Sequence, residues 1–335
     1  MGRVIDIPQL DGWIPVRLYW QAEGGQAERP FVDWCYLDTQ RFTDPFFSQT
    51  IGACLHGPFN LLFRHQTPIE VLGRRAALHP GLKPTGFIFH MSRCGSTLVS
   101  QVLASLSSAI VISEAAPIDS TLRTHLRNPR ISDELRATWL QWMVSALAQP
   151  RRGDEQHVFI KFDAWNTVDL SLIRQAFPEV PWVFLYRDPV EVMVSQFNHR
   201  GAHMVPGVID PGLFGMNINT IAEMESDEYC AKVLATICQA ALRHHAIGGM
   251  LINYKQLPQA IWEKFLGRFG VYCTEAELEK MRGTARLDAK NPAIVFSHDT
   301  AKKRQKATDA VRAAAERWLY PVYEQLEAAR LSAPA

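Results

Sequence analysis

The chain has 335 residues, of which 47% are hydrophobic and 21% are charged, a composition typical of folded globular proteins and unlike that of disordered or fibrous chains. Lys and Arg (35) nearly balance Asp and Glu (34), so the sequence lacks the broad basic surface of proteins that coat nucleic acid or anionic membranes. Any anion-binding site is therefore expected to be local.

The sequence carries no signal for a membrane span, a leader or a metal. No apolar run reaches eighteen residues, and the first thirteen residues include charges and lack a continuous apolar core. The six cysteines are far apart and form no CxxC pair, as expected for reduced thiols rather than a disulfide framework or a zinc site. We therefore expect a cytoplasmic protein without a cysteine zinc site.

Residues 1–84 are rich in aromatic and turn residues and contain no motif that indicates a chemistry. Short strands are expected at residues 16–20 and 31–37, and a helix at residues 68–78. We interpret this part as an N-terminal extension, of unknown role, that packs on the main domain.

Residues 85–330 alternate between apolar strands and amphipathic helices, which predicts a three-layer α/β fold with a central parallel sheet. Strands are expected at residues 87–90, 109–113, 157–162, 182–187 and 250–254. Helices are expected at 95–106, within 117–148, at 168–177, 190–197, 219–246, 261–269 and 275–281, and from about 307 onward. Pro321 is expected to kink or break the last helix.

The first predicted strand of this domain runs into a tight loop and a helix, which is the architecture of an anion site. The backbone N–H groups expected to converge at this helix N-terminus are those of Cys94, Gly95, Ser96 and Thr97. Arg93 precedes them, where its guanidinium can offset charge that develops on a leaving phosphate. The loop lacks GxxxxGK[ST], and no lysine precedes the Ser-Thr pair, so a ligand other than ATP is indicated.

A second element follows the strand at residues 182–187. Arg187 ends this strand, an Asp-Pro turn follows, and Ser195 lies on the next helix, so the two side chains can point to one spot. A guanidinium and a hydroxyl together suit a phosphate monoester, a group that ATP does not carry.

These two elements resemble those of the sulfotransferase superfamily, which use 3′-phosphoadenosine-5′-phosphosulfate (PAPS) as donor. The resemblance implies a P-loop-type nucleotide-binding fold in which the first loop holds the 5′-phosphosulfate, and Arg187 and Ser195 hold the 3′-phosphate. It also implies that a basic segment before the last helix covers the 3′-phosphate, which makes candidates of Lys302, Lys303 and Arg304. The implied function is transfer of a sulfuryl group from PAPS to the hydroxyl of a small-molecule or glycan acceptor, with no metal required.

The acceptor hydroxyl needs a base. Protein-tyrosine and several carbohydrate sulfotransferases use a Glu after the strand that follows the phosphate-loop helix, and Glu114 stands at that place in this sequence. Asp163, at a similar strand end, is the alternative, and Lys161 is expected to assist at the sulfuryl oxygens. His90, His199 and His203 are interpreted as polar wall residues.

Other functions stay open at this point. Asp163 ends a hydrophobic strand as a Walker-B magnesium ligand would, so a P-loop kinase with a degenerate Walker A motif is the main alternative. A non-catalytic nucleotide-binding or scaffold protein is a third. The acceptor pocket is expected to involve residues 1–84 and 200–218, because specificity usually resides in connecting segments. Trp165 is a candidate for stacking on the adenine.

Overall fold

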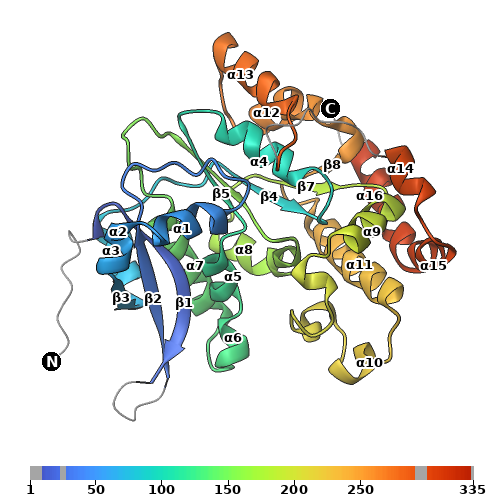
Figure 1. The fold of residues 1–335 in the computed structure, drawn as a ribbon, viewed down its shortest axis with the longest axis horizontal. Helices are drawn as coiled ribbons and strands as arrows, with labels where there is room; N and C mark the ends of the chain where they lie inside the picture. The colour runs from blue at the N-terminus through green and yellow to red at the C-terminus, as the bar shows by residue number, and fades with distance from the viewer. Residues whose placement is uncertain (1–9, 23–27, 291–299, 333–335) are drawn as a thin grey trace.

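The main sheet has five parallel strands, which lie in the order β5–β6–β4–β7–β8 (Figure 1). They are β4 (Gly86–His90), β5 (Ala109–Ser113), β6 (His157–Lys161), β7 (Trp182–Tyr186) and β8 (Gly249–Asn253). These bounds come from a computed structural model that describes residues 10–22, 28–290 and 300–332. Every residue of β4, β5 and β7 is buried, as expected for a parallel sheet covered on both faces. The predicted α/β fold with a central parallel sheet is confirmed.

Helices cover the sheet on its two faces (Figure 1). On one face α4 (Ser96–Ala104) packs against α13 (Glu275–Ala285). On the other, α8 (Leu170–Ala176) packs against α7 (Asp133–Leu147) and α11 (Ser226–His244). The remaining helices named below are α5 (Ala116–Leu122), α6 (Thr124–Arg127), α9 (Pro189–Asn198), α12 (Leu266–Arg268) and α14 (Thr300–Gln305).

Two helical segments differ from expectation. The helix expected at residues 219–246 is two helices, α10 (Ile218–Ala222) and α11, because Glu225 adopts extended backbone angles (φ −61°, ψ 145°) and starts a new helix. The last helix continues past Pro321: α15 (Asp309–Ala314) passes through a π-helical turn over Ala315–Leu319 into α16 (Tyr320–Ser332). This wider turn lies directly before the proline, whose ring and missing N–H a regular helix would not accommodate.

The described part of the N-terminal extension contains a three-stranded antiparallel sheet, β1 (Trp13–Gln21), β2 (Arg29–Tyr36) and β3 (His65–Pro68). Its helices are α1 (Phe47–Leu55), α2 (Pro58–Leu62) and α3 (Glu70–Leu78). The two strands and the helix predicted here are therefore confirmed. β1 packs against α5 and α3 packs against α7, so the extension covers one flank of the main domain (Figure 1). The domain division after residue 84 stays a prediction.

No helix in the described part of the chain combines the length and apolarity needed to cross a membrane. The cytoplasmic location stays a prediction.

The strand order brings particular chain segments to one edge. Counted along the chain within this sheet, the strands lie second, third, first, fourth, fifth, with β4 between β6 and β7. The connection after β4 leads to one side of the sheet, and β7 lies on the other side of β4. In such sheets ligands bind at the carboxyl ends of the strands, where the connections part. The loops after β4, β5, β6 and β7 carry the residues singled out above.

Candidate functional site

A cavity of about 480 Å³ is lined by residues that follow the carboxyl ends of these strands. Its lining contains five cationic side chains, those of Arg93, Arg187, Arg200, Lys290 and Lys303. It contains three carboxylates, those of Glu114, Asp163 and Asp288. Five against three leaves the lining cationic on a chain whose formal net charge is only +1, so the predicted local anion site has a physical basis here.

The loop after β4 has the backbone of an anion cradle. Ser92, Arg93 and Gly95 have positive φ angles of 74°, 52° and 87°, and α4 begins directly afterwards. Successive turns of this kind aim backbone N–H groups into one concavity at the helix N-terminus. Cys94 turns its side chain inward, where Sγ donates to the Leu185 carbonyl at 3.1 Å, and burial raises the pKa of this thiol to about 12. Cys94 can therefore contribute its backbone N–H, and its thiol is no nucleophile.

Gly95 is required by both conformation and space. Besides its left-handed backbone, a Cβ placed there would come within 2.7 Å of Leu257 Cδ1 and 3.0 Å of Tyr254 Cδ2. Both neighbours belong to the segment after β8. The loop is therefore packed against the end of the fifth strand as well as the first.

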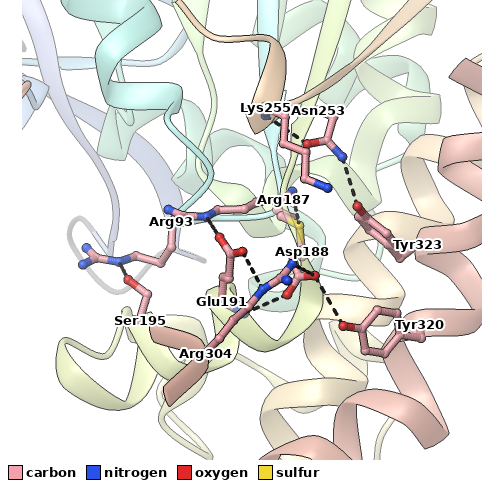
Figure 2. Close-up of polar contacts among 11 residues, drawn as sticks. Arg93, Arg187, Asp188, Glu191, Ser195, Asn253, Lys255, Arg304, Tyr320 and Tyr323 are labelled. Carbon is pink, nitrogen blue, oxygen red and sulfur yellow. Dashed lines mark hydrogen bonds and ion pairs between the residues drawn. The ribbon is translucent and has the colours of Figure 1, made fainter. Parts of the chain in front are cut away.

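Arg93 and Ser195 join the two sequence elements. Arg93 Nε donates to Ser195 Oγ at 2.8 Å, across 102 residues of sequence (Figure 2). Arg187 lines the same cavity, and its Nε donates to Glu191 Oε2 at 2.7 Å. Its guanidinium lies 4.0 Å from the centroid of the Tyr254 ring. The structure thus brings Arg93, Arg187 and Ser195 to one cavity, as the sequence predicts, and adds two partners that sequence reasoning missed.

The basic segment before the last helix is divided. Lys303 lines the cavity, whereas the side chain of Lys302 lies outside the described residues. Arg304 is not among the lining residues. It donates to Glu191 Oε1 at 3.1 Å and to Asp188 Oδ2 at 3.0 Å (Figure 2), so it links α14 to α9. That Arg304 binds the nucleotide stays a prediction. In this arrangement Arg304 would act indirectly, through Glu191.

Glu114 holds the centre of a charged cluster. It follows β5 with a φ of 56°, and its N–H donates to the Lys161 carbonyl at 2.8 Å. Its Oε1 lies 2.9 Å from Lys161 Nζ and 3.4 Å from His90 Nε2. Burial favours the neutral acid, but Lys161 and His90 outweigh it and hold the pKa of Glu114 well below its ordinary value. This carboxylate is ionised at neutral pH.

His90 orients Glu114 and does not compete for its proton. The Ser92 N–H donates to His90 Nδ1 at 3.0 Å, so the ring proton belongs on Nε2, which faces Glu114. Burial lowers the pKa of His90 despite the nearby carboxylate. Lys161 is completely buried and is not a lining residue, so it reaches the cavity only through Glu114.

The remaining predicted wall residues are present in the lining. Asp163 is buried, and burial followed by the charges of Glu114 and Asp119 raises its pKa well above the ordinary value. His203 is buried against Trp165, with ring centroids 5.3 Å apart, and burial followed by the charge of His90 lowers its pKa to about 3. His199 also lines the cavity. Glu114 and Asp163 are thus two carboxyl groups whose surroundings push their pKa values apart, a common property of acid–base sites.

No cluster of three or more His, Cys, Asp or Glu suited to a metal ion occurs within residues 10–22, 28–290 and 300–332. The expectation that the site needs no metal stays a prediction.

No family model matches the chain, and no curated protein sequence matches it. The chain is similar to a solved sulfotransferase domain from the curacin biosynthetic pathway, with 15% identity and a TM-score of 0.41 over 71% of this chain and 97% of that one. It is similar to a sulfotransferase from Alicyclobacillus acidocaldarius, with 12% identity and a TM-score of 0.44 over 75% and 97% of the two chains. It is also similar to a sulfotransferase from Mycobacterium tuberculosis, with 12% identity and a TM-score of 0.43 over 75% of this chain and 82% of that one.

These solved structures are all sulfotransferases, the superfamily whose motifs the sequence resembles. The α/β fold with its central parallel sheet follows from the strand order, and the arrangement of side chains in the cavity carries the functional argument.

Proposed function

We propose that this protein is a sulfotransferase that binds PAPS in the cavity and transfers the sulfuryl group to an acceptor hydroxyl. The observation that carries the proposal is the Arg93–Ser195 hydrogen bond, because it brings the two phosphate-binding elements to one cavity. The cationic lining and the left-handed loop fit the two separate phosphate groups of this donor.

The 5′-phosphosulfate and the 3′-phosphate of the donor each have a matching set of groups. The loop N–H groups and α4 would hold the 5′-phosphosulfate, through the residues Cys94, Gly95, Ser96 and Thr97. Arg187, Ser195 and Lys303 would hold the 3′-phosphate. Arg187 is prepared for this by Glu191 and Tyr254, which fix the plane of its guanidinium.

The transfer is a displacement at sulfur. The acceptor oxygen forms a bond to sulfur, the bond between sulfur and the 5′-phosphate oxygen breaks, and the acceptor proton passes to Glu114. Negative charge grows on the leaving phosphate, and Arg93 is the lining cation attached to the loop that would meet it. His90 and Lys161 keep Glu114 ionised and oriented.

The kinase alternative fits this site less well. A Walker-B aspartate holds magnesium as an ionised carboxylate. The surroundings of Asp163, the residue in the Walker-B position, favour its neutral form. No lysine precedes Ser96 and Thr97 in the loop, so the cation that a Walker A motif directs to the β- and γ-phosphates is lacking.

The nucleotide itself provides the first test. Adenosine 3′,5′-bisphosphate is the nucleotide that remains after PAPS has lost its sulfuryl group. It is expected to raise the melting midpoint with or without magnesium, whereas AMP and ADP at equal concentration raise it little. A ligand at a hundred times its dissociation constant stabilises the fold by about 2.7 kcal/mol, which thermal-shift measurement detects readily. Arg187→Ala is expected to remove most of the bisphosphate's advantage over AMP, because a charged hydrogen bond contributes about 1.5 to 3 kcal/mol.

The matched control is Arg282→Ala, which removes a half-exposed arginine of α13 outside the cavity lining. Glu191 keeps Arg304 as a partner in the Arg187 variant, so the fold is expected to survive. If ATP with magnesium gives the largest shift and the bisphosphate gives none, the sulfotransferase proposal is wrong and the kinase alternative replaces it.

The pH profile distinguishes the two carboxyl groups. A general base works only when deprotonated, so kcat/KM falls as the pH drops through its pKa in the free enzyme. Because the pKa of Glu114 lies below its ordinary value of about 4.3, kcat/KM is expected to show no loss from this group between neutral pH and about pH 5. An acid limb well above the ordinary carboxyl range would instead identify Asp163, whose pKa is raised.

A further inference from the structure

The N-terminal extension reaches the cavity through one side chain. Phe46 lies directly before α1, and among the described residues of the extension it is the one that lines the cavity. Its ring centroid is 5.0 Å from Lys161 Nζ and 5.5 Å from Lys290 Nζ. Both distances fall within the range of about 6 Å over which an aromatic face attracts a cation.

Lys161 needs such a neighbour. Its side chain is completely buried, and Glu114 is its ionic partner in the part of the chain that the structure describes. An ammonium group has three N–H bonds, and a buried charge that loses water without compensation is costly. The Phe46 ring therefore takes the place that water would otherwise occupy at Nζ.

The segment that carries Phe46 is anchored to the phosphate-loop helix. Arg41 Nη2 donates to the carbonyls of Ala104 and Leu106, at 2.8 and 2.6 Å, at the C-terminal end of α4. Carbonyls at a helix C-terminus lack intrahelical partners and attract cations. The same helix thus faces the cavity at its first turn and holds the extension at its last.

A local turn fixes the ring itself. Thr50 Oγ1 donates to Asp44 Oδ2 at 2.6 Å, and the Phe46 N–H donates to Gln49 Oε1 at 3.2 Å. These bonds close the start of α1 on both sides of Phe46. The backbone that carries the ring is thus held by bonds within the protein, and the ring lies beside Lys161 without a ligand.

We infer that Phe46 is a positioning residue of the site, whose ring covers Lys161 and keeps its ammonium group out of water where it pairs with Glu114. The N-terminal extension then contributes a residue to the site, besides covering one flank of the main domain. Its consequence for sulfuryl transfer rests on the proposed function, whereas the shielding of Lys161 does not.

Shielding can be measured by the reactivity of the lysine amine. The full-length protein is treated with a limiting amount of acetic anhydride, and acetylation at each lysine is followed by peptide mass spectrometry. Phe46→Ala is expected to raise the rate at Lys161 by at least about tenfold, because local opening to reagent no longer requires displacement of the ring. Phe46→Tyr, which keeps the aromatic face, is expected to retain the slow rate.

Reference and control variants isolate the effect. The rate at Lys280, an exposed residue of α13, is expected to stay constant in every variant. Phe63→Ala removes an exposed phenylalanine of the same extension, outside the cavity lining, and is expected to leave Lys161 unreactive. Equal rates at Lys161 in the wild type and in Phe46→Ala overturn the inference.

A destabilised Phe46→Ala variant leaves the inference testable. If all lysines react faster in it, Phe46→Leu is compared with Phe46→Tyr, since leucine fills the space without an aromatic face. Faster reaction of Lys161 in the leucine variant supports the inference, and equal slow rates in the two variants overturn the role of the ring face.

The failure of this inference can be told apart from failure of the proposed function. The bisphosphate is expected to shift the melting midpoint of Phe46→Ala as much as that of the wild type, while turnover of PAPS with an acceptor falls through kcat. If the bisphosphate shifts neither protein, the proposed function fails, and the acetylation rates still decide whether Phe46 shields Lys161.

Discussion

Glu114→Gln is expected to lower turnover by roughly 10² to 10⁴, the usual effect of losing a general base, while the bisphosphate shift stays unchanged. The amide has the shape of the carboxylate, and its oxygen can still accept from Lys161, which lies 2.9 Å from Glu114 Oε1. The neutral amide does not balance the charge of buried Lys161, so the melting midpoint is expected to fall, and turnover is compared at a temperature at which both proteins are folded. PAPS consumption measured against phenols, sugars, lipids and peptides gives the rate, and the same panel identifies the acceptor.

The matched variant is Asp163→Asn, which removes the carboxyl group of the alternative base in the cavity lining. Its expected loss is smaller, because burial favours the neutral form of Asp163 and a neutral acid accepts no proton. Normal turnover in Glu114→Gln together with an inactive Asp163→Asn would move the base to Asp163. The decrease of kcat/KM at low pH would then begin above the ordinary carboxyl range.

Arg93→Ala is the second change with a large expected effect. Turnover is expected to fall by roughly 10² to 10³, as for other groups that stabilise charge developing in a transition state, and nucleotide affinity is expected to fall much less. Single-turnover rates with bound PAPS, compared with bisphosphate dissociation constants, separate the two effects. An equal loss in both would identify Arg93 as a residue that binds ground state and transition state alike.

Ser195→Ala provides the control for Arg93. It removes the acceptor of the 2.8 Å bond from Arg93 Nε but leaves the guanidinium in place. A smaller loss of turnover than that of Arg93→Ala is expected, since the charge is kept and its orientation is relaxed. Ser195 is also a proposed ligand of the 3′-phosphate, so the bisphosphate dissociation constant of this variant separates that loss of binding from the effect on the alignment of Arg93.

The main sheet could be predicted because its strands are short, apolar and buried on both faces. The predicted bounds of β5 match those in the structure, and the predicted bounds of the other four strands differ by at most one residue at each end. The phosphate loop could also be anticipated, because a strand, a glycine turn and a helix in succession leave few backbone solutions. The strands and the loop both depend on neighbouring residues in the sequence, so one sequence is enough to predict them.

The cluster around Glu114 could not be predicted in full. His90 and Lys161 end neighbouring strands, β4 and β6, and Glu114 follows a third, β5. Their meeting depends on strand order, which the sequence of elements does not determine. Lys161 was expected to act at the sulfuryl oxygens, but its complete burial gives it a role behind Glu114.

Long-range side-chain partners were missed for the same reason. Arg304 belongs to a basic run that is typical of a solvated helix end, and its partners Asp188 and Glu191 lie more than a hundred residues away. Phe46 belongs to an aromatic-rich segment with no motif. The local sequence around Arg304 and around Phe46 does not indicate a site, because the residues that they contact are brought near only by the tertiary fold.

Tyr254 connects the two phosphate-binding elements through simple contact. Its ring lies 3.0 Å from the place of a Cβ at Gly95, and the same ring contacts the guanidinium of Arg187. A side chain at position 95 is therefore expected to press on the ring that supports Arg187. During evolution, such a side chain is expected to be accepted more readily where Tyr254 and Leu257 have also changed.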